Sequence, residues 1–498
     1  MAAVDVLGGP APAPAPLAVD GELKPPFLTK LFYAFGQAIE SGYLIVSGFV
    51  FFYYTAVLGL SGTMVGIALA ISMAIDAVMD PLIGSISDNL RTRFGRRLPL
   101  MVLGAPLTGL ALWMLFSPPV GLQPLILFLW LVFAKMALRA VASLYNLPYA
   151  ALGAEMASGY AERASVVAYR GVFGVVISIA VTILALSVFF AGPGGLQERS
   201  YYTSFGAGMG ALLFACGAVC CLGVWNYARR LPQPTTPGAT LLGGLAHGAP
   251  EVFRNASFRS LFLSALLFWI AAGVNGSLNN HAYTFVWRMT PQMIQPVNIS
   301  FYLAILLGVP LTRPLLNRFE KKTVIMLGLG VVVVSMTVLH GLRALGLFTL
   351  TGEAVVPWLM SSVFLGGVGI GFLVVAYPAM MADAADEHEV LFGVRREGLY
   401  FAGLGFASKA ATGFGQMAAG FALDALRFPE TAGHAAGTPV PEHALRMLIL
   451  AWGPFAAIFA VGSALALLPY AVSRARHAEL AAAVKLKRAK DLSAGRSS

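Results

Sequence analysis

Two aspartates, Asp76 and Asp80, lie four residues apart in an otherwise apolar stretch of the chain. In a helix this spacing stacks both carboxylates on one face, one turn apart. Two anions this close repel, so in a low dielectric one must take up a proton or both must share a cation. Pro81 follows directly and cannot donate a backbone hydrogen bond, which leaves the carbonyl oxygen of Ala77 free beside the pair. The segment predicts either a hard-oxygen site for Na⁺ or a proton-accepting pair for H⁺.

A structural interpretation of the same pair stays open, in which one aspartate pairs with Arg139 or Arg170 only to hold helices together. Apolar stretches also carry Glu40, Lys135 and Lys409. A charged side chain at mid-bilayer costs at least about 2.5–3.5 kcal/mol, so each of these residues needs a partner, a water-filled cavity or an ion. Any one of them could form an inert ion pair, but as a group they indicate a polar central cavity.

A short basic loop follows the acidic segment. Asp88 stands before a run that contains Arg91, Arg96 and Arg97. At a helix end, Asp88 can pair with the following arginines and brace a tight loop. This spacing predicts a brace that supports gating, and the alternative is that the arginines serve only as a topology signal.

The composition requires lipid as the main solvent. The 498 residues are 58% hydrophobic and only 11% charged, whereas a soluble domain carries about 25% charged residues. The sequence shows no nucleophile–base pair, metal motif or phosphate-binding loop, so an enzyme is not expected and neither is a cofactor. The net charge of +10 fits contact with anionic lipid headgroups and requires no nucleic acid.

A spanning helix needs about 20 mostly apolar residues, and such stretches recur along almost the whole chain. Two sets of six, separated by a polar break, predict an all-α membrane protein with twelve transmembrane helices in two six-helix bundles. The expected helices cover residues 29–54, 62–86, 99–117, 123–153, 166–191, 204–227, 259–285, 297–317, 323–345, 356–382, 398–424 and 444–470. The expected domains are a disordered tail (1–26), a first bundle (27–228), a linker (229–257), a second bundle (258–471) and a basic tail (472–498).

Basic residues predict the orientation of these helices. With both termini in the cytoplasm, most loop arginines and lysines fall on the cytoplasmic side, as the positive-inside rule demands. The opposite side keeps few basic residues, namely Arg199, Arg288, Arg343, Arg427 and, depending on where the last span begins, Arg446. We therefore expect a multi-pass protein of the cell (inner) membrane with cytoplasmic N- and C-termini.

Four stretches together resemble a known family. They are Asp76–Gly84 with the arginine-rich loop behind it, Asn146–Leu152, Tyr160–Arg170, and Met381–Lys409. In order and spacing they are similar to the glycoside–pentoside–hexuronide:cation symporters of the major facilitator superfamily, from about Leu31 to about Ala422.

The resemblance implies roles for individual residues. Asp76 and Asp80 match the ligands of the coupling cation, Ser143 matches a hydroxyl that joins them, and Lys409 matches a lysine near that site. Sugar-binding positions correspond to Glu40, Asn146, Ala150 and Arg170. The cytoplasmic brace is expected to include Asp88, Arg91, Arg96 and Arg97, with Asp383, Asp386, Arg395 and Arg396 as its counterpart in the second half.

Three positions depart from the family's galactoside-carrying type member. Met79 replaces an asparagine that helps bind Na⁺, and a thioether is a poor ligand for a hard cation, which favours H⁺. Asn146 replaces an aspartate that binds sugar hydroxyls, and Ala150 replaces a tryptophan that stacks on the galactoside ring. These changes make a simple galactoside an unfavourable substrate and favour a bulkier, anionic or modified sugar.

The expected function is therefore symport of a sugar, glycoside or modified sugar with H⁺ or Na⁺, by alternating access in a monomer. Alternatives are a symporter of a lysolipid-like or other amphipathic solute, a proton-driven exporter, and a receptor that does not transport. The expected partners are a small-molecule substrate and the lipid bilayer.

Overall fold

The computed structural model describes residues 23–231, 250–394, 396–429, 440–480 and 482. Regular structure in these residues is helical throughout, as expected for a backbone that must satisfy its own hydrogen bonds in lipid. Eleven of the described helical segments are long and apolar enough to span a bilayer. The twelfth long helix, α14 (Glu397–Ala425), carries the polar residues Lys409 and Gln416. The predicted all-helical fold class is confirmed.

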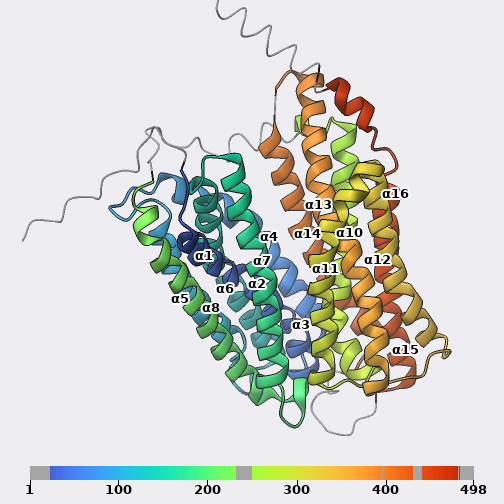
Figure 1. Ribbon diagram of the computed structural model, residues 1–498. Helices are drawn as coiled ribbons and strands as arrows, with labels where there is room; N and C mark the ends of the chain where they lie inside the picture. Colours follow the sequence, from blue (N-terminus) through green and yellow to red (C-terminus); the bar gives the residue numbers. More distant parts are fainter. Residues whose placement is uncertain (1–22, 232–249, 395, 430–439, 481, 483–498) are drawn as a thin grey trace, which may run out of the picture.

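The first six spans form one bundle (Figure 1). The first span is divided at Gly36 and Gly48 into α1 (Phe27–Phe35), α2 (Gln37–Ser47), α3 (Val50–Phe52) and a π turn, η1 (Tyr53–Val57). The remaining spans are α4 (Gly62–Asn89), α5 (Leu98–Leu115), α6 (Pro124–Glu155), α7 (Tyr160–Leu184) with η2 (Ala185–Phe189), and α8 (Arg199–Ala228).

The second bundle repeats this arrangement. It comprises α10 (Ala256–His281) with η4 (Ala282–Val286), α11 (Pro291–Arg318), α12 (Lys321–Ala344), α13 (Val356–Phe392), α14, and α15 (Glu442–Leu450) continued by η6 (Ala451–Phe455) and α16 (Ala456–Ala466). The first span of each bundle ends in a π turn, η1 and η4 respectively. This correspondence fits an internal duplication of a six-helix unit.

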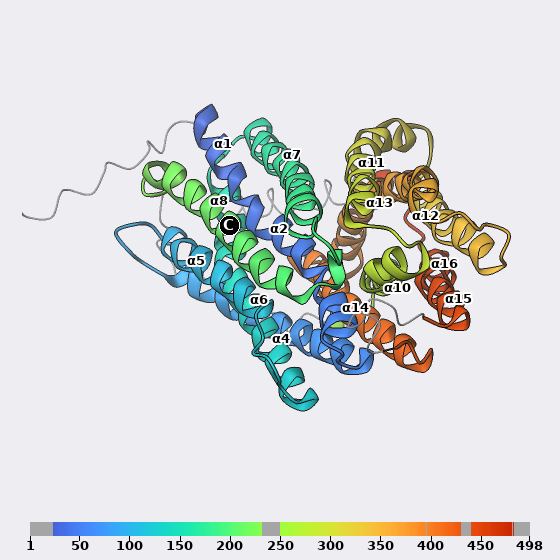
Figure 2. The same cartoon turned by 90° about the horizontal axis from the view of Figure 1, so that it is seen from below.

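The bundles meet along two helix pairs, α4 with α14 and α7 with α11. Figure 2, which looks along the helices, shows these pairs on opposite sides of the boundary between the bundles. In Figure 1 the bundles diverge towards the end of the molecule where α1 begins and the chain leaves α16. We call this the terminal end and the opposite end the far end.

Direct contacts join the two bundles at the far end. Thr55 Oγ1 of η1 lies 2.8 Å from His281 Nε2 of α10. The carboxylate of Asp424 on α14 accepts hydrogen bonds from the backbone N–H groups of Gly62 (2.7 Å) and Thr63 (2.8 Å), the first residues of α4. An acidic group suits this position because the N-terminus of a helix presents unpaired donors and a positive dipole.

Several helix ends differ from their predictions by five residues or more, since α7, α8 and α11 begin five or six residues early, and the largest difference is at the end of α13. The apolar stretch predicts that the tenth span ends at residue 382, but α13 continues to Phe392. The helix ends at Gly393, whose φ of 84° lies in the left-handed region that glycine readily adopts at a helix end. Apolar composition therefore did not indicate where this helix stops. Most of the predicted linker at 229–257 lies outside the described residues.

Candidate functional site

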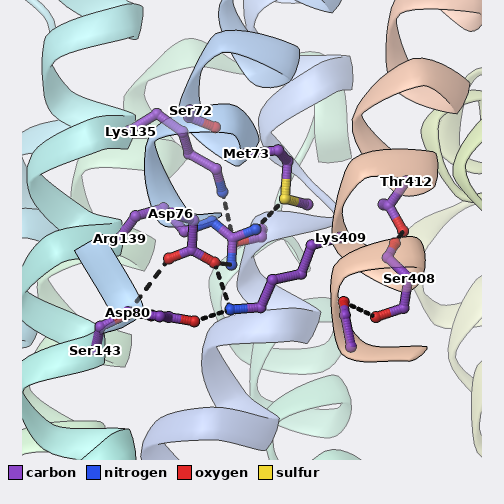
Figure 3. A network of polar contacts seen from close by, with 12 residues as sticks. Ser72, Met73, Asp76, Asp80, Lys135, Arg139, Ser143, Ser408, Lys409 and Thr412 are labelled. Carbon is purple, nitrogen blue, oxygen red and sulfur yellow. Dashed lines mark hydrogen bonds and ion pairs between the residues drawn. The ribbon is translucent and has the colours of Figure 1, made fainter. Parts of the chain in front are cut away.

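The acidic pair lies where the bundles touch, and Figure 3 shows its surroundings. Asp76 is buried with 2% of its side chain exposed, whereas Asp80, one turn further along α4, is 21% exposed. Ser143 on α6 donates a hydrogen bond to Asp80 Oδ1 (2.7 Å), and its Oγ lies 3.4 Å from Asp76 Oδ1. One hydroxyl from a neighbouring helix therefore bridges both carboxylates.

The opposite bundle supplies a cation to the same pair. Lys409 Nζ on α14 lies 2.8 Å from Asp76 Oδ2 and also contacts Asp80 Oδ2 (Figure 3). This is an ion-pair contact across the boundary between the bundles, and it joins residues 329 positions apart in the sequence. Relative movement of the bundles at this point must therefore change the environment of both carboxylates.

Two more cations lie beside the pair on α6. Arg139 Nη1 is 3.3 Å from Asp76 Oδ2, and its guanidinium also contacts the Met73 sulfur. Lys135 is buried, donates to Ser47 Oγ (2.9 Å) and lies 5.0 Å from the centre of the Tyr43 ring. Two carboxylates and three cationic side chains leave no net negative charge for a further cation in this conformation.

A second charged cluster, of Glu40 and Gln37 on α2 with Arg170 on α7, lies in the first bundle. Arg170 Nη2 pairs with Glu40 Oε2 (2.9 Å) and Nε donates to Gln37 Oε1 (2.6 Å), while Gln37 Nε2 donates to Glu40 Oε2 (3.1 Å). The Arg170 side chain is 30% exposed and that of Glu40 is 40% exposed. The possibility that Arg170 pairs with an aspartate of α4 is therefore wrong for this conformation, because Glu40 takes that place.

Asn146 and Ala150 occupy the same face of α6 as Arg139 and Ser143, since the spacings of four, three and four follow the helical repeat. Asn146 Oδ1 is buried without a hydrogen-bond partner among the described residues. Ala150 is exposed. The neighbouring Tyr149 ring lies 5.3 Å from the Arg170 guanidinium, so α6 contributes to both charged clusters.

The predicted brace of the first bundle forms around Arg97. Arg97 pairs with Asp88 (2.6 Å) and Glu155 (2.8 Å), and Arg96 pairs with the same glutamate (2.7 Å). Arg91 is exposed on the surface. Glu155 at the end of α6 was not predicted. An acidic residue at the end of an apolar helix could have indicated a partner for the loop arginines.

In the second bundle, Asp383 lies 2.7 Å from Lys321 and 3.4 Å from His477, and His477 is also 3.6 Å from Asp386. Arg396 pairs instead with Glu251 (3.4 Å). Arg395 lies outside the described residues. The partners Lys321, His477 and Glu251 were not predicted, because sequence spacing does not indicate contacts between distant segments.

Two six-helix bundles that meet at a boundary are the arrangement of many secondary transporters. A sequence profile of the family described as MFS/sugar transport protein matches residues 32–474, and the chain belongs to this family. Its family and fold are those of membrane transporters, not of enzymes. The predicted resemblance to the major facilitator superfamily is confirmed, and the chain is a multi-pass membrane protein.

Individual relatives are similar to this chain over most of its length. An uncharacterized symporter of Synechocystis sp. is 26% identical over 91% of this chain and 96% of its own length. The isoprimeverose transporter of Lactiplantibacillus pentosus is 24% identical over 83% of this chain and 84% of its own. A solved bacterial homologue of the human lysosomal transporter Spinster superimposes with a TM-score of 0.60 at 14% identity, covering 90% of this chain and 98% of that one.

Proposed function

We propose that this protein couples the movement of a cation to the transport of a sugar or glycoside across the cell membrane. The observation that carries the proposal is the contact of Asp76 and Asp80 in one bundle with Lys409 in the other. Two acidic side chains at a moving boundary provide a site whose affinity for a cation depends on conformation. Family membership, the symporter of Synechocystis sp. and the isoprimeverose transporter support the same function.

Coupling follows from competition for the carboxylates. Lys409 and Arg139 neutralise the pair in the present conformation. An additional cation would therefore have to enter a site whose negative charge is already neutralised. If the bundles separate here, Lys409 withdraws and the carboxylates become free for a cation. When the bundles close again, the ammonium group returns and displaces that cation. A cation with different affinity for the two conformations shifts their populations, which is the requirement for coupling.

We propose H⁺ as the coupling ion. Ser143 Oγ donates a hydrogen bond to Asp80, and the residue before Asp80 is Met79, whose thioether suits hard cations poorly. A carboxylate next to a second carboxylate can accept a proton once its cationic partner leaves. Na⁺ coupling requires additional oxygen ligands that Met79 does not supply.

We propose that the substrate binds at Glu40, Gln37 and Arg170, with Asn146 and Ala150 in the adjoining wall. A carboxylate, an amide and a guanidinium present acceptors and donors side by side, which suits neighbouring hydroxyl groups of a sugar. Their partial exposure allows a solute to reach them. Substrate would then bind between the bundles, and movement of one bundle relative to the other would expose it to each side in turn.

Reconstituted vesicles test this function. With purified protein in Na⁺-free medium, addition of isoprimeverose, xylose or glucuronate outside should alkalinise the external medium as sugar and H⁺ enter together. We expect Asp76→Asn and Asp80→Asn to abolish concentrative uptake, because neither amide can bind the coupling cation as a carboxylate does.

The matched control is Glu353→Gln, which removes an exposed carboxylate near the start of α13 and should transport normally. Concentrative uptake that survives in both aspartate variants would exclude the proposed coupling site. Sugar uptake that needs Na⁺ and moves no protons would support symport but exclude H⁺ as the coupling ion.

A further inference from the structure

A cavity of about 300 Å³ lies between α2 of the first bundle and the helices of the second bundle. It is separate from the carboxylate pair, and none of its lining residues belongs to the predicted substrate site. Its volume lies at the lower end of the range of about 300–1,000 Å³ that is usual for ligand pockets. The cavity is large enough to bind a small organic group.

Side-chain amides dominate the polar part of its wall. Asn275 and Asn279 lie on one face of α10, Asn280 follows, and Asn298 lies on α11. Figure 2 shows α10 on the inner side of the second bundle beside α14. Asn279 Oδ1 accepts a hydrogen bond from Trp452 Nε1 (2.9 Å), and Asn275 Nδ2 donates to the Trp452 backbone oxygen (3.0 Å). These bonds hold two of the amides in place and leave the Asn275 oxygen and the Asn279 nitrogen available.

Two other polar groups on the wall have hydrogen-bonding capacity that the described residues do not use. The Asn298 amide makes no hydrogen bond among the described contacts. His340 is 3% exposed, its Nδ1 is 2.9 Å from the Met336 oxygen, and its Nε2 is buried without a partner in the described part of the chain. A buried polar nitrogen without a partner is unfavourable, so a ligand or water that bonds to it stabilises the site.

The lining contains aromatic rings but no acidic or basic side chain other than His340. Rings of Trp452, Tyr283 and Tyr302 offer apolar faces with polar edges. A carboxylate or ammonium group would lose its hydration there without gaining an opposite charge, which is costly. Amides and an imidazole both donate and accept hydrogen bonds, as hydroxyl groups do. The chemistry of the wall therefore fits a neutral, hydroxyl-rich ring.

The cavity begins one helical turn from the charged cluster. Glu40, Leu44 and Gly48 follow one another at intervals of four residues along one face of the first span, and Leu44 and Gly48 line the cavity. One helical turn, or about 6 Å, separates Glu40 from Leu44 along the axis. Leu44, which lies between the charged cluster and the cavity, is 62% exposed.

We propose that this cavity is a second subsite, which binds a neutral hydroxylated ring of a two-part solute whose other part lies at Glu40 and Arg170. The inference depends on the proposed function and extends it from a sugar in general to a disaccharide or a glycoside with a hydroxylated second unit. Specificity for the second unit then resides in the asparagines of α10 and α11.

Gly276 allows a selective test. It lines the cavity, and a Cβ atom at this position would meet no other atom within 4 Å, so we expect Gly276→Leu to fill part of the cavity from its wall. Gly330→Leu is the matched control, because Gly330 is an exposed helical glycine outside the cavity with equally open surroundings. A second variant, Asn298→Leu, removes an amide at nearly constant volume.

Calorimetric titration of purified protein should compare two pairs of probes: isoprimeverose with xylose, and a glucuronate–hexose disaccharide with glucuronate. We expect the wild type and Gly330→Leu to bind at least one disaccharide about tenfold or more tightly than its monosaccharide. Gly276→Leu should reduce that disaccharide's affinity to the level of the monosaccharide, and Asn298→Leu should reduce the preference several-fold. Melting curves of each variant establish that it is folded.

Three results are distinguishable. Loss of the preference in folded Gly276→Leu or Asn298→Leu supports the subsite. A disaccharide preference that survives in both variants, or its absence from a wild type that binds monosaccharides, overturns the subsite and leaves the proposed function standing. A wild type that binds none of the four sugars overturns both proposals.

Discussion

At the scale of single residues, Lys409 is the most informative side chain. It is the residue of the second bundle that contacts both Asp76 and Asp80, and it is 35% exposed, so it can leave the pair without crossing a packed interior. Arg139, by contrast, belongs to the same bundle as the aspartates and is only 12% exposed. Movement of the bundles can therefore withdraw Lys409 and leave Arg139 in place.

Lys409→Met tests this difference. It keeps the length of the side chain and removes the charge that competes with the coupling cation. We expect the cation concentration for half-maximal binding to fall about tenfold or more, equivalent to at least about 1.4 kcal/mol, while concentrative uptake decreases because the cation is no longer displaced. Sugar-binding affinity measured over a range of pH and Na⁺ concentrations provides the readout.

Lys322→Met serves as the control, since Lys322 on α12 donates to backbone oxygens at the terminal end and not to a carboxylate. An unchanged cation dependence in Lys409→Met would contradict displacement by the ammonium group.

At the scale of helices, close contact of α4 with α14 closes the far end. Gly62 and Gly66 of α4 face Gly420 and Met417 of α14, and the backbones approach so closely that added side-chain atoms would overlap. Small residues permit this approach between membrane helices, where van der Waals packing contributes much of the association. The same two helices carry Asp80 and Lys409, so closure of the far end and neutralisation of the pair are parts of one contact.

Gly420→Ala should disturb that contact. The added methyl group would overlap the Gly62 carbonyl oxygen, so the far end could not close without a shift of the helices. We expect uptake to fall about tenfold or more, because overpacking costs typically about 1–3 kcal/mol. Initial uptake rates in vesicles, normalised to the amount of folded protein, measure the effect.

Gly405→Ala on the same helix is the matched control, because its new methyl group would meet nothing within 4 Å. Equal rates for the two variants would show that the glycine contact does not limit transport.

At the scale of the whole molecule, the distribution of basic residues predicts which side each end faces. The braces around Arg97 and Asp383 lie at the terminal end, as do Arg474 and Arg476 after α16. Arg199 is at the opposite end, 3.1 Å from the Pro118 oxygen in the loop after α5. We therefore propose that the terminal end faces the cytoplasm. The divergence of the bundles there would then correspond to an inward-facing conformation (Figure 1).

Single cysteines test this orientation. Cys216, Cys220 and Cys221 are all buried and can be replaced by alanine to provide a background. In intact cells, a membrane-impermeant thiol reagent should label Val120→Cys, which is 85% exposed at the far end, and should not label Arg476→Cys. Both sites should react in permeabilised cells. Labelling of Arg476→Cys alone in intact cells would reverse the proposed orientation.

Much of the fold and part of the candidate site were predictable from sequence. Apolar stretches of about 20 residues predict the helices because the bilayer sets their length. The spacing of Asp76 and Asp80 places both on one face of α4 for the same local reason. Polar helix ends were less predictable, since α13 continues ten residues past the end of its apolar stretch.

Contacts between distant segments were decided by the tertiary structure. The sequence by itself determined that charges occur in the membrane, but it left open whether Arg170 or Arg139 would meet the aspartates. Packing of α7 beside α2 directed Arg170 to Glu40, while α6 beside α4 brought Arg139 and Ser143 to the pair. Such partners depend on helix packing across large sequence separations, whereas helix formation and same-face spacing are local. The cavity lined by asparagines arises in the same way, because it exists only where α2, α10 and α11 come together.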